Sequence, residues 1–90
     1  MWVLRFAAQA AEQMRRLDKA AARRIKVYLD EMIDSGDPRS RGRALSGSLA
    51  GYWRYRIGDY RVVAAIEDGR LVVVALQVGH RSQVYRSAPQ

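Results

Sequence analysis

The segment VGHRSQVYR, residues 78–86, places side chains that handle protons and phosphates directly after an apolar run. It contains His80, the only histidine of the chain, together with Arg81 and Tyr85. Imidazole transfers protons near neutral pH, and a guanidinium group binds phosphate through paired hydrogen bonds. An apolar strand that ends in these groups indicates a site for a phosphate-containing ligand.

Three more arginines lie on the two apolar runs that precede this segment. Arg54 and Arg56 are in YWRYRI, residues 52–57, and Arg61 is in YRVVAAIE, residues 60–67. Like charges that face each other destabilise a sheet by up to about 1 kcal/mol per pair. Three arginines on one sheet face therefore favour a phosphate site, although solvated arginines that point apart are the simpler alternative.

The turn at Gly58-Asp59 determines which residues of these two strands lie opposite each other. Glycine at the first of two loop positions suits a type II′ turn, and a two-residue loop fixes the register. Ile57 is then opposite Tyr60, and Arg56 is opposite Arg61. Because side chains alternate between the faces of a strand, the three arginines share one face.

A second turn, Asp68-Gly69, leads into RLVVVALQV, residues 70–78. Asp-Gly suits a type I′ turn, which pairs Glu67 with Arg70 as an ion pair. Alternation with period two then places His80 on the arginine face. That face also carries Val63, Val72, Val74, Leu76 and Val78. The opposite, nearly all apolar face carries Trp53, Tyr55, Ile57, Tyr60, Val62, Ala64, Ile66, Leu71, Val73 and Ala75.

The N-terminal part of the chain predicts a strand followed by two helices. WVLRF, residues 2–6, is typical of a short strand, and apolar residues at helical spacing predict a helix over 7–17. Asp18 suits the N-cap of a second helix that ends at Gly36. Its apolar face contains Ala21, Ile25, Tyr28, Leu29 and Met32. We therefore predict one α+β domain over 1–90, of order βααβββ, with a helical hairpin on one face of a small, mainly antiparallel four-stranded sheet.

The segment GDPRSRGRAL, residues 36–45, is expected to be a loop because it is rich in Gly, Pro, Ser and Arg. Its three arginines are Arg39, Arg41 and Arg43. The segment is either a solvated connector or a mobile clamp for RNA phosphates, and the sequence leaves both interpretations open.

Sixteen Lys and Arg residues stand against nine Asp and Glu, a formal charge of +7. This surplus favours a polyanionic partner, with nucleic acid first and an acidic protein second, although the base composition of the genome would produce the same arginine bias. The absence of cysteine favours a cytoplasmic protein and excludes a thiolate metal site. We expect no metal, no cofactor and no membrane span, because no run reaches about 20 apolar residues.

The segment ALSGSLAGYWRYRIGDYRVVAAIEDGRLVVVALQVGHRSQVY resembles the RelE family of bacterial toxins, within the RelE/ParE superfamily of type II toxin–antitoxin systems. WRYRIGDYRV and VGHRSQVY, in this order and spacing, are its most specific parts. The resemblance implies a RelE-like fold similar to that of microbial ribonucleases and a toxin that cleaves mRNA in the ribosomal A site. It also implies a heteromeric complex with a RelB-like antitoxin that carries an acidic or amphipathic C-terminal segment.

The resemblance implies roles for individual residues. Arg54 and Arg56 occupy positions where RelE toxins often carry basic residues, commonly lysines. Arg61 matches the arginine of the family's GYR motif, here GDYR, and Arg81 matches the arginine after VG. Tyr85 matches the closing tyrosine and is expected to stack on a base. The implied mechanism needs no metal ion: the 2′-OH of the mRNA attacks the adjacent phosphate, and the arginines neutralise the transition state.

The general base of this reaction is the open point. Arginine at both 54 and 56 leaves no lysine on this strand, and arginine effectively does not lose its proton. His80 is one candidate for the base, with a strand-capping role as its alternative. Ribosomal RNA or a water molecule is a further source.

Two other functions are compatible with the sequence. A ParE-like toxin shares the fold and inhibits DNA gyrase without nuclease activity, although ParE toxins generally lack the closing VGHR…VY pattern. A plain RNA-binding module is the other alternative.

Overall fold

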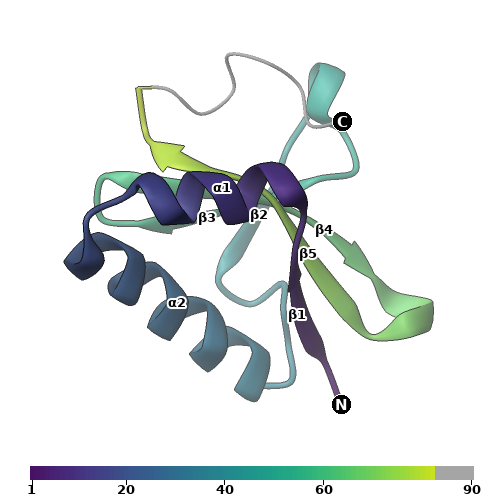
Figure 1. The fold of residues 1–90 in the computed structure, drawn as a ribbon. Coiled ribbons are helices and arrows are strands. Elements are labelled where there is room, and N and C mark those ends of the chain that lie inside the picture. The colour runs from purple at the N-terminus through teal and green to yellow at the C-terminus, as the bar shows by residue number, and fades with distance from the viewer. Residues whose placement is uncertain (83–90) are drawn as a thin grey trace.

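In a computed structural model that describes residues 1–82, the chain forms two helices and a five-stranded sheet (Figure 1). The elements in chain order are β1 (Val3–Phe6), α1 (Ala8–Arg16), α2 (Lys19–Asp34), β2 (Gly42–Ala44), β3 (Trp53–Ile57), β4 (Tyr60–Glu67) and β5 (Val72–His80). Short 3-10 turns lie at Gly47–Leu49 and Asp68–Arg70. The α+β class and the helical pair on one face of the sheet are confirmed.

The sheet has the strand order β1-β5-β4-β3-β2, in which β1 runs parallel to β5 and the other pairs are antiparallel. The fifth strand, β2, lies inside the segment that was expected to be a loop. It pairs Gly42 with Tyr55, and a Cβ at Gly42 would lie 3.0 Å from Cε1 of the Tyr55 ring. A three-residue edge strand that begins with glycine has no apolar alternation, so the sequence pattern did not reveal it.

The second helix, α2, begins and ends where local chemistry predicts. The Asp18 carboxylate accepts a hydrogen bond from the backbone N–H of Ala21 at 2.8 Å, which confirms the predicted N-cap of α2. Such a cap contributes about 1 kcal/mol to stability. Beyond Ser35, the C-cap of α2, Gly36 has a φ of +79°, a conformation that glycine adopts at little cost.

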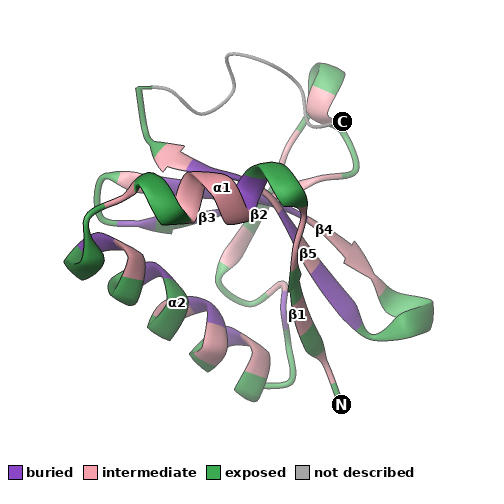
Figure 2. Cartoon of the chain, viewed as in Figure 1, coloured by how far each residue is buried: buried purple, intermediate pink, exposed green. Residues whose placement is uncertain are grey.

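The core lies between the helices and the sheet face that they cover (Figures 1 and 2). The helices contribute Ala10, Ile25, Leu29 and Met32 to it. The sheet contributes Tyr55, Ile57, Val62, Ala64, Val73, Ala75 and Val78. Most of these sheet residues belong to the predicted apolar face, so that prediction is largely confirmed.

The connection between β4 and β5 is longer than predicted. Glu67 pairs across the ladder with Val72 and not with Arg70, so four residues separate the strands. Leu71, predicted in the core, is 39% exposed and has a φ of +56°. The Arg70–Glu67 ion pair does form, at 2.9 Å, but it lies within the turn. An ion pair at this spacing is therefore compatible with more than one register.

An extra residue in β5 reverses the faces of the residues that follow it. Ala64 pairs with Ala75, whereas its neighbour Val63 pairs with Gln77, so Leu76 is left unpaired as a β-bulge. The predicted period-two alternation is therefore wrong beyond Leu76.

The bulge corrects two predictions about the end of β5. Val78 pairs with Val62 and is 2% exposed in the core, although it was predicted on the arginine face. His80 pairs with Tyr60 on the helix side of the sheet and not with the arginines. A residue after the bulge points to the face opposite to the one that simple alternation gives.

Candidate functional site

The β3–β4 turn holds the side chain of Arg61. Arg61 Nη1 donates to the carbonyl oxygens of Gly58 at 2.8 Å and Tyr60 at 2.9 Å, and the residue is only 8% exposed. These bonds offset the desolvation of a buried guanidinium group. Gly58 has a φ of +58°, as the first position of a type II′ turn requires, and the predicted pairing of Arg56 with Arg61 is confirmed.

The same turn anchors the segment that follows β5. The backbone N–H of Arg81 donates to the carbonyl oxygen of Asp59 at 2.8 Å. Gly58, Asp59 and Tyr60 therefore all accept hydrogen bonds from Arg61 or Arg81. As a result, two arginines that lie 20 positions apart in the sequence are fixed to one three-residue segment.

A further arginine reaches this turn from α2. A Cβ at Gly58 would lie 2.7 Å from Nη2 of Arg24, so the Arg24 guanidinium group lies directly against the glycine. Arg24 was not among the predicted site residues, because its position in α2 marks it only as an exposed helical arginine. The close approach becomes visible only when α2 is packed on the sheet.

His80 lies at the edge of this arginine group, on the other side of the sheet. Its ring packs edge-on against the Tyr60 ring, with centroids 6.0 Å apart and an interplanar angle of 82°. Its Nδ1 lies 3.1 Å from Oγ of Ser82. The imidazole is exposed, so it is accessible to a ligand that approaches this end of the sheet.

Two of the predicted catalytic residues stand apart from this arrangement. Arg54 pairs with Val63 in the middle of the sheet, one step further from the turn than Arg56, and its Nε is buried without a hydrogen bond to residues 1–82. Tyr85 lies outside the residues that the structure describes. The turn cluster is therefore Arg24 and Arg61, whose side chains contact the β3–β4 turn, with Arg81, bound to it through its backbone, and Arg56, paired with Arg61. His80 lies at the same end of the sheet, on the face opposite to Arg56 and Arg61.

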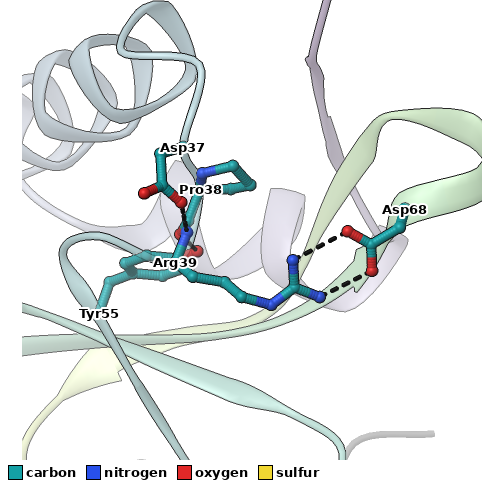
Figure 3. Close-up of polar contacts among 5 residues, drawn as sticks. All are labelled: Asp37, Pro38, Arg39, Tyr55 and Asp68. Atoms are coloured by element: carbon teal, nitrogen blue, oxygen red, sulfur yellow. Dashed lines mark hydrogen bonds and ion pairs between the residues drawn. The ribbon is translucent and has the colours of Figure 1, made fainter.

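The Arg39 side chain is bound to the opposite end of the sheet (Figure 3). It donates two hydrogen bonds to the Asp68 carboxylate, at 2.8 and 2.7 Å, and its guanidinium carbon lies 5.4 Å from the centre of the Trp53 ring. The carboxylate raises the pKa of Arg39, and Arg39 lowers the pKa of Asp68. Next to this pair, the Tyr55 hydroxyl donates to the carbonyl oxygen of Pro38, and burial raises the pKa of Tyr55 to about 12.

The other two arginines of the 36–45 segment have different neighbours. Arg41 lies 3.6 Å from a Glu31 carboxylate oxygen and over the Tyr28 ring, 5.3 Å from its centre. Arg43 is in β2, opposite Arg54. The structure does not bring the three arginines together as one clamp, and their binding of RNA stays a prediction.

The 1–82 range contains no group of three or more His, Asp or Glu residues placed to bind a metal ion. No helix in this range is long and apolar enough to cross a membrane. The chemistry that the turn cluster offers is electrostatic stabilisation of an anion, with one imidazole for proton transfer.

Comparison with known proteins identifies the family. Residues 4–85 match the family model described as the ParE toxin of type II toxin–antitoxin system, parDE. Toxin RelE of Mycobacterium tuberculosis is 36% identical over 83 residues, which cover 91% of this chain and 84% of that protein.

Solved structures agree. The toxin–antitoxin complex RelBE2 of Mycobacterium tuberculosis matches with a TM-score of 0.81 and 28% identity, over 89% of this chain and 98% of that chain. The isolated E. coli RelE toxin matches with a TM-score of 0.75 and 28% identity, over 94% of this chain and 92% of that chain. The resemblance seen in the sequence is thus confirmed. The chain belongs to the ParE toxin family of type II toxin–antitoxin systems, and within it the chain is RelE-like.

Proposed function

We propose that this toxin is a ribosome-dependent endoribonuclease that cleaves mRNA in the ribosomal A site and acts in the cytoplasm. The observation that carries the proposal is the β3–β4 turn, whose backbone carbonyls bind the guanidinium group of Arg61 and the backbone N–H of Arg81. Arg56 extends from the same hairpin. A guanidinium group that is fixed in place, as that of Arg61 is, suits a phosphate whose charge increases in the transition state.

The proposed reaction needs no metal ion. The 2′-oxygen of one nucleotide forms a bond to the adjacent phosphorus, and the bond from phosphorus to the 5′-oxygen of the next nucleotide breaks. The products are a 2′,3′-cyclic phosphate and a 5′-hydroxyl end. Arg56 and Arg61 would neutralise the phosphate, with Arg54 further along β3. Arg81 would stabilise the negative charge on the leaving 5′-oxygen, which takes its proton from water.

His80 is our candidate for the group that accepts the 2′-OH proton. Proton acceptance at Nε2 requires the tautomer in which Nδ1 carries the ring hydrogen and donates it to Ser82 Oγ, 3.1 Å away, in place of accepting the Ser82 backbone N–H. Tyr85, outside the described residues, keeps its proposed role in stacking on a base. The ribosome would supply the in-line geometry, since the site itself contains few proton-transfer groups.

We also propose that a RelB-like antitoxin with an acidic or amphipathic segment neutralises the toxin. The valine strip expected on the arginine face is a weak candidate for the contact, because Val63 and Val72 are buried and Val78 is in the core. A groove of about 620 Å³ beside α2 fits better, because it is lined by Arg23, Arg24 and Val27, and Val27 is 51% exposed. Its other lining residues are Ala20, Tyr28, Glu31 and Ile57.

Gyrase inhibition is the second candidate function, because the matching family model is described as a ParE toxin. One pair of assays separates the two. In a translation extract, 5′-end mapping is expected to show new mRNA ends only when ribosomes are present, and purified gyrase is expected to keep its supercoiling activity. New ends without ribosomes, or lost supercoiling with intact mRNA, would contradict the proposal.

A further inference from the structure

The bulge in β5 changes the direction of a backbone N–H group close to the turn cluster. Along a strand, successive residues direct their N–H and C=O groups alternately to the two neighbouring strands. The unpaired Leu76 shifts this alternation, so the N–H of Val78 is directed away from β4. β1 offers it no acceptor, because the last residue of β1, Phe6, pairs with Ala75.

Gln13 of α1 provides the acceptor. Its side-chain Oε1 accepts a hydrogen bond from the backbone N–H of Val78 at 2.7 Å, between residues 65 positions apart. Val78 is in the core, so without this bond its N–H would be desolvated with no partner. A glutamine on a helix is usually a solvated residue, and the sequence pattern gave it no role.

The bond lies directly before the proposed site. His80 follows Val78 by two residues and packs against Tyr60, and Arg81 follows by three and is bound to Asp59 through its backbone. Besides its pairing with residues 60–62 of β4, the segment 78–81 is held by Gln13 at Val78 and by the β3–β4 turn at Arg81. Gln13 binds Val78 through its side chain, whereas Asp59 and Arg81 bind each other through backbone atoms.

We propose that Gln13 is a positioning residue: its side-chain oxygen holds the bulged end of β5 in the conformation that presents His80 and Arg81 to the RNA phosphate. This inference rests on the proposed ribonuclease function. Gln13 itself touches the backbone of Val78 and is not assigned any contact with RNA. Loss of the bond would leave the N–H of Val78 without its acceptor and loosen the bulged end of β5 that carries His80 and Arg81.

Three variants test this role. Gln13→Met keeps the length of the side chain and removes the oxygen, whereas Gln13→Glu keeps an oxygen that can accept the bond. Gln9→Ala is the matched control, because Gln9 is an exposed glutamine of the same helix. Thermal unfolding of each variant verifies that it folds, and the readouts are amide hydrogen exchange at Val78, the Tyr60–His80 ring contact by NMR, and mRNA cleavage on programmed ribosomes.

We expect Gln13→Met to expose the Val78 amide to exchange and to weaken the Tyr60–His80 ring contact. At saturating ribosome concentration its cleavage rate should fall on the order of tenfold to a hundredfold, since small misplacements have effects of that size. The ribosome concentration for half-maximal rate should not change. Gln13→Glu and Gln9→Ala should behave like the wild type.

A folded Gln13→Met with unchanged Val78 exchange or unchanged cleavage overturns the inference, as does a Gln13→Glu that is as defective as Gln13→Met. If Gln13→Met does not fold, Gln13→Ala takes its place: an exposed Val78 amide together with lowered cleavage supports the role, and wild-type exchange and cleavage refute it. If the wild type cuts no mRNA, the proposed function fails. In that case, Val78 exchange and the Tyr60–His80 contact still show whether Gln13 holds the segment.

Discussion

At the scale of single residues, the roles of the arginines depend on what holds them. Arg61 is nearly buried and bound to two carbonyl oxygens, whereas Arg56 is exposed. A guanidinium group that is fixed before the substrate binds needs no reorganisation in the transition state. The buried arginine should therefore contribute more to catalysis than the exposed one.

We predict that Arg61→Lys, which keeps the charge, lowers mRNA cleavage on the order of a hundredfold, because an ammonium group cannot reproduce the planar contacts of guanidinium. Arg70→Lys is the matched control, since Arg70 lies in the β4–β5 turn at the other end of the sheet. Cleavage of a ribosome-bound mRNA measures both. Equal activity of the two variants would remove Arg61 from the site.

The prediction for His80 concerns the cleavage rate. If the imidazole accepts the 2′-OH proton, His80→Ala lowers the cleavage rate at saturating ribosome concentration, because the variant lacks the proton acceptor. Binding to the ribosome should be unaffected, since the exposed His80 ring packs edge-on against Tyr60. A variant that cleaves mRNA at the wild-type rate would assign the base to ribosomal RNA or water.

At the scale of elements, the sequence predicted the helix cap and the β3–β4 turn, but it did not predict the bulge in β5. Asp18 caps the helix that follows it, and Gly58 takes the positive φ of the turn in which it lies. Both features depend on neighbouring residues in the sequence, and both were predicted. The stretch LVVVALQV is apolar at nearly every position, so nothing in it distinguishes the two faces or marks Leu76 as the extra residue. The face of His80 therefore could not be read from alternation.

The contacts of the segment between α2 and β3 could not be predicted from the sequence either. Its arginines could be recognised as a group, but their partners are distant in sequence: Arg39 binds Asp68, 29 positions away. Arg24 and Gln13 likewise acquire their contacts only through helix packing on the sheet. Side chains whose role depends on a long-range contact leave no local pattern.

The Arg39–Asp68 pair yields a prediction about stability. Because Arg39 lowers the pKa of Asp68, the pair stabilises the fold above the unfolded pKa of an aspartate, about 3.9, and that contribution disappears as the pH falls through the lower, folded pKa. Asp68→Asn should thus lower the urea midpoint modestly at neutral pH. The difference from the wild type should close at low pH and shrink in high salt, since both side chains are partly exposed. A difference that is constant with pH would show that the carboxylate charge is not involved.

At the scale of the whole molecule, arginines that contribute to the formal charge of +7 lie in two groups. One arginine group surrounds the β3–β4 turn, where we place the RNA phosphate, and another lines the groove beside α2. Arg24 belongs to both, because it lines the groove and lies against Gly58. An acidic segment in the groove would therefore compete for an arginine that contacts the turn of the proposed active site.

This shared arginine gives a prediction about neutralisation. Val27→Glu introduces a carboxylate between Arg23 and Arg24, where an acidic antitoxin segment would bind, and glutamate is a good helix former, so α2 should remain intact. The variant should bind the co-expressed antitoxin on the order of tenfold more weakly, through lost apolar contact and like-charge repulsion. Val3→Glu, at a valine 40% exposed on β1, is the control for adding a charge at an exposed valine.

The salt dependence of the complex checks the electrostatic part of this argument. High ionic strength should weaken the wild-type complex, because it screens the attraction between the arginines and the acidic segment. It should also narrow the difference in affinity between the wild type and Val27→Glu, because the added repulsion is screened while the loss of apolar contact remains. Cells that express the antitoxin should then be killed by Val27→Glu and survive the wild type and Val3→Glu. If Val27→Glu is neutralised as well as the wild type at every salt concentration, the groove beside α2 is not where the antitoxin binds.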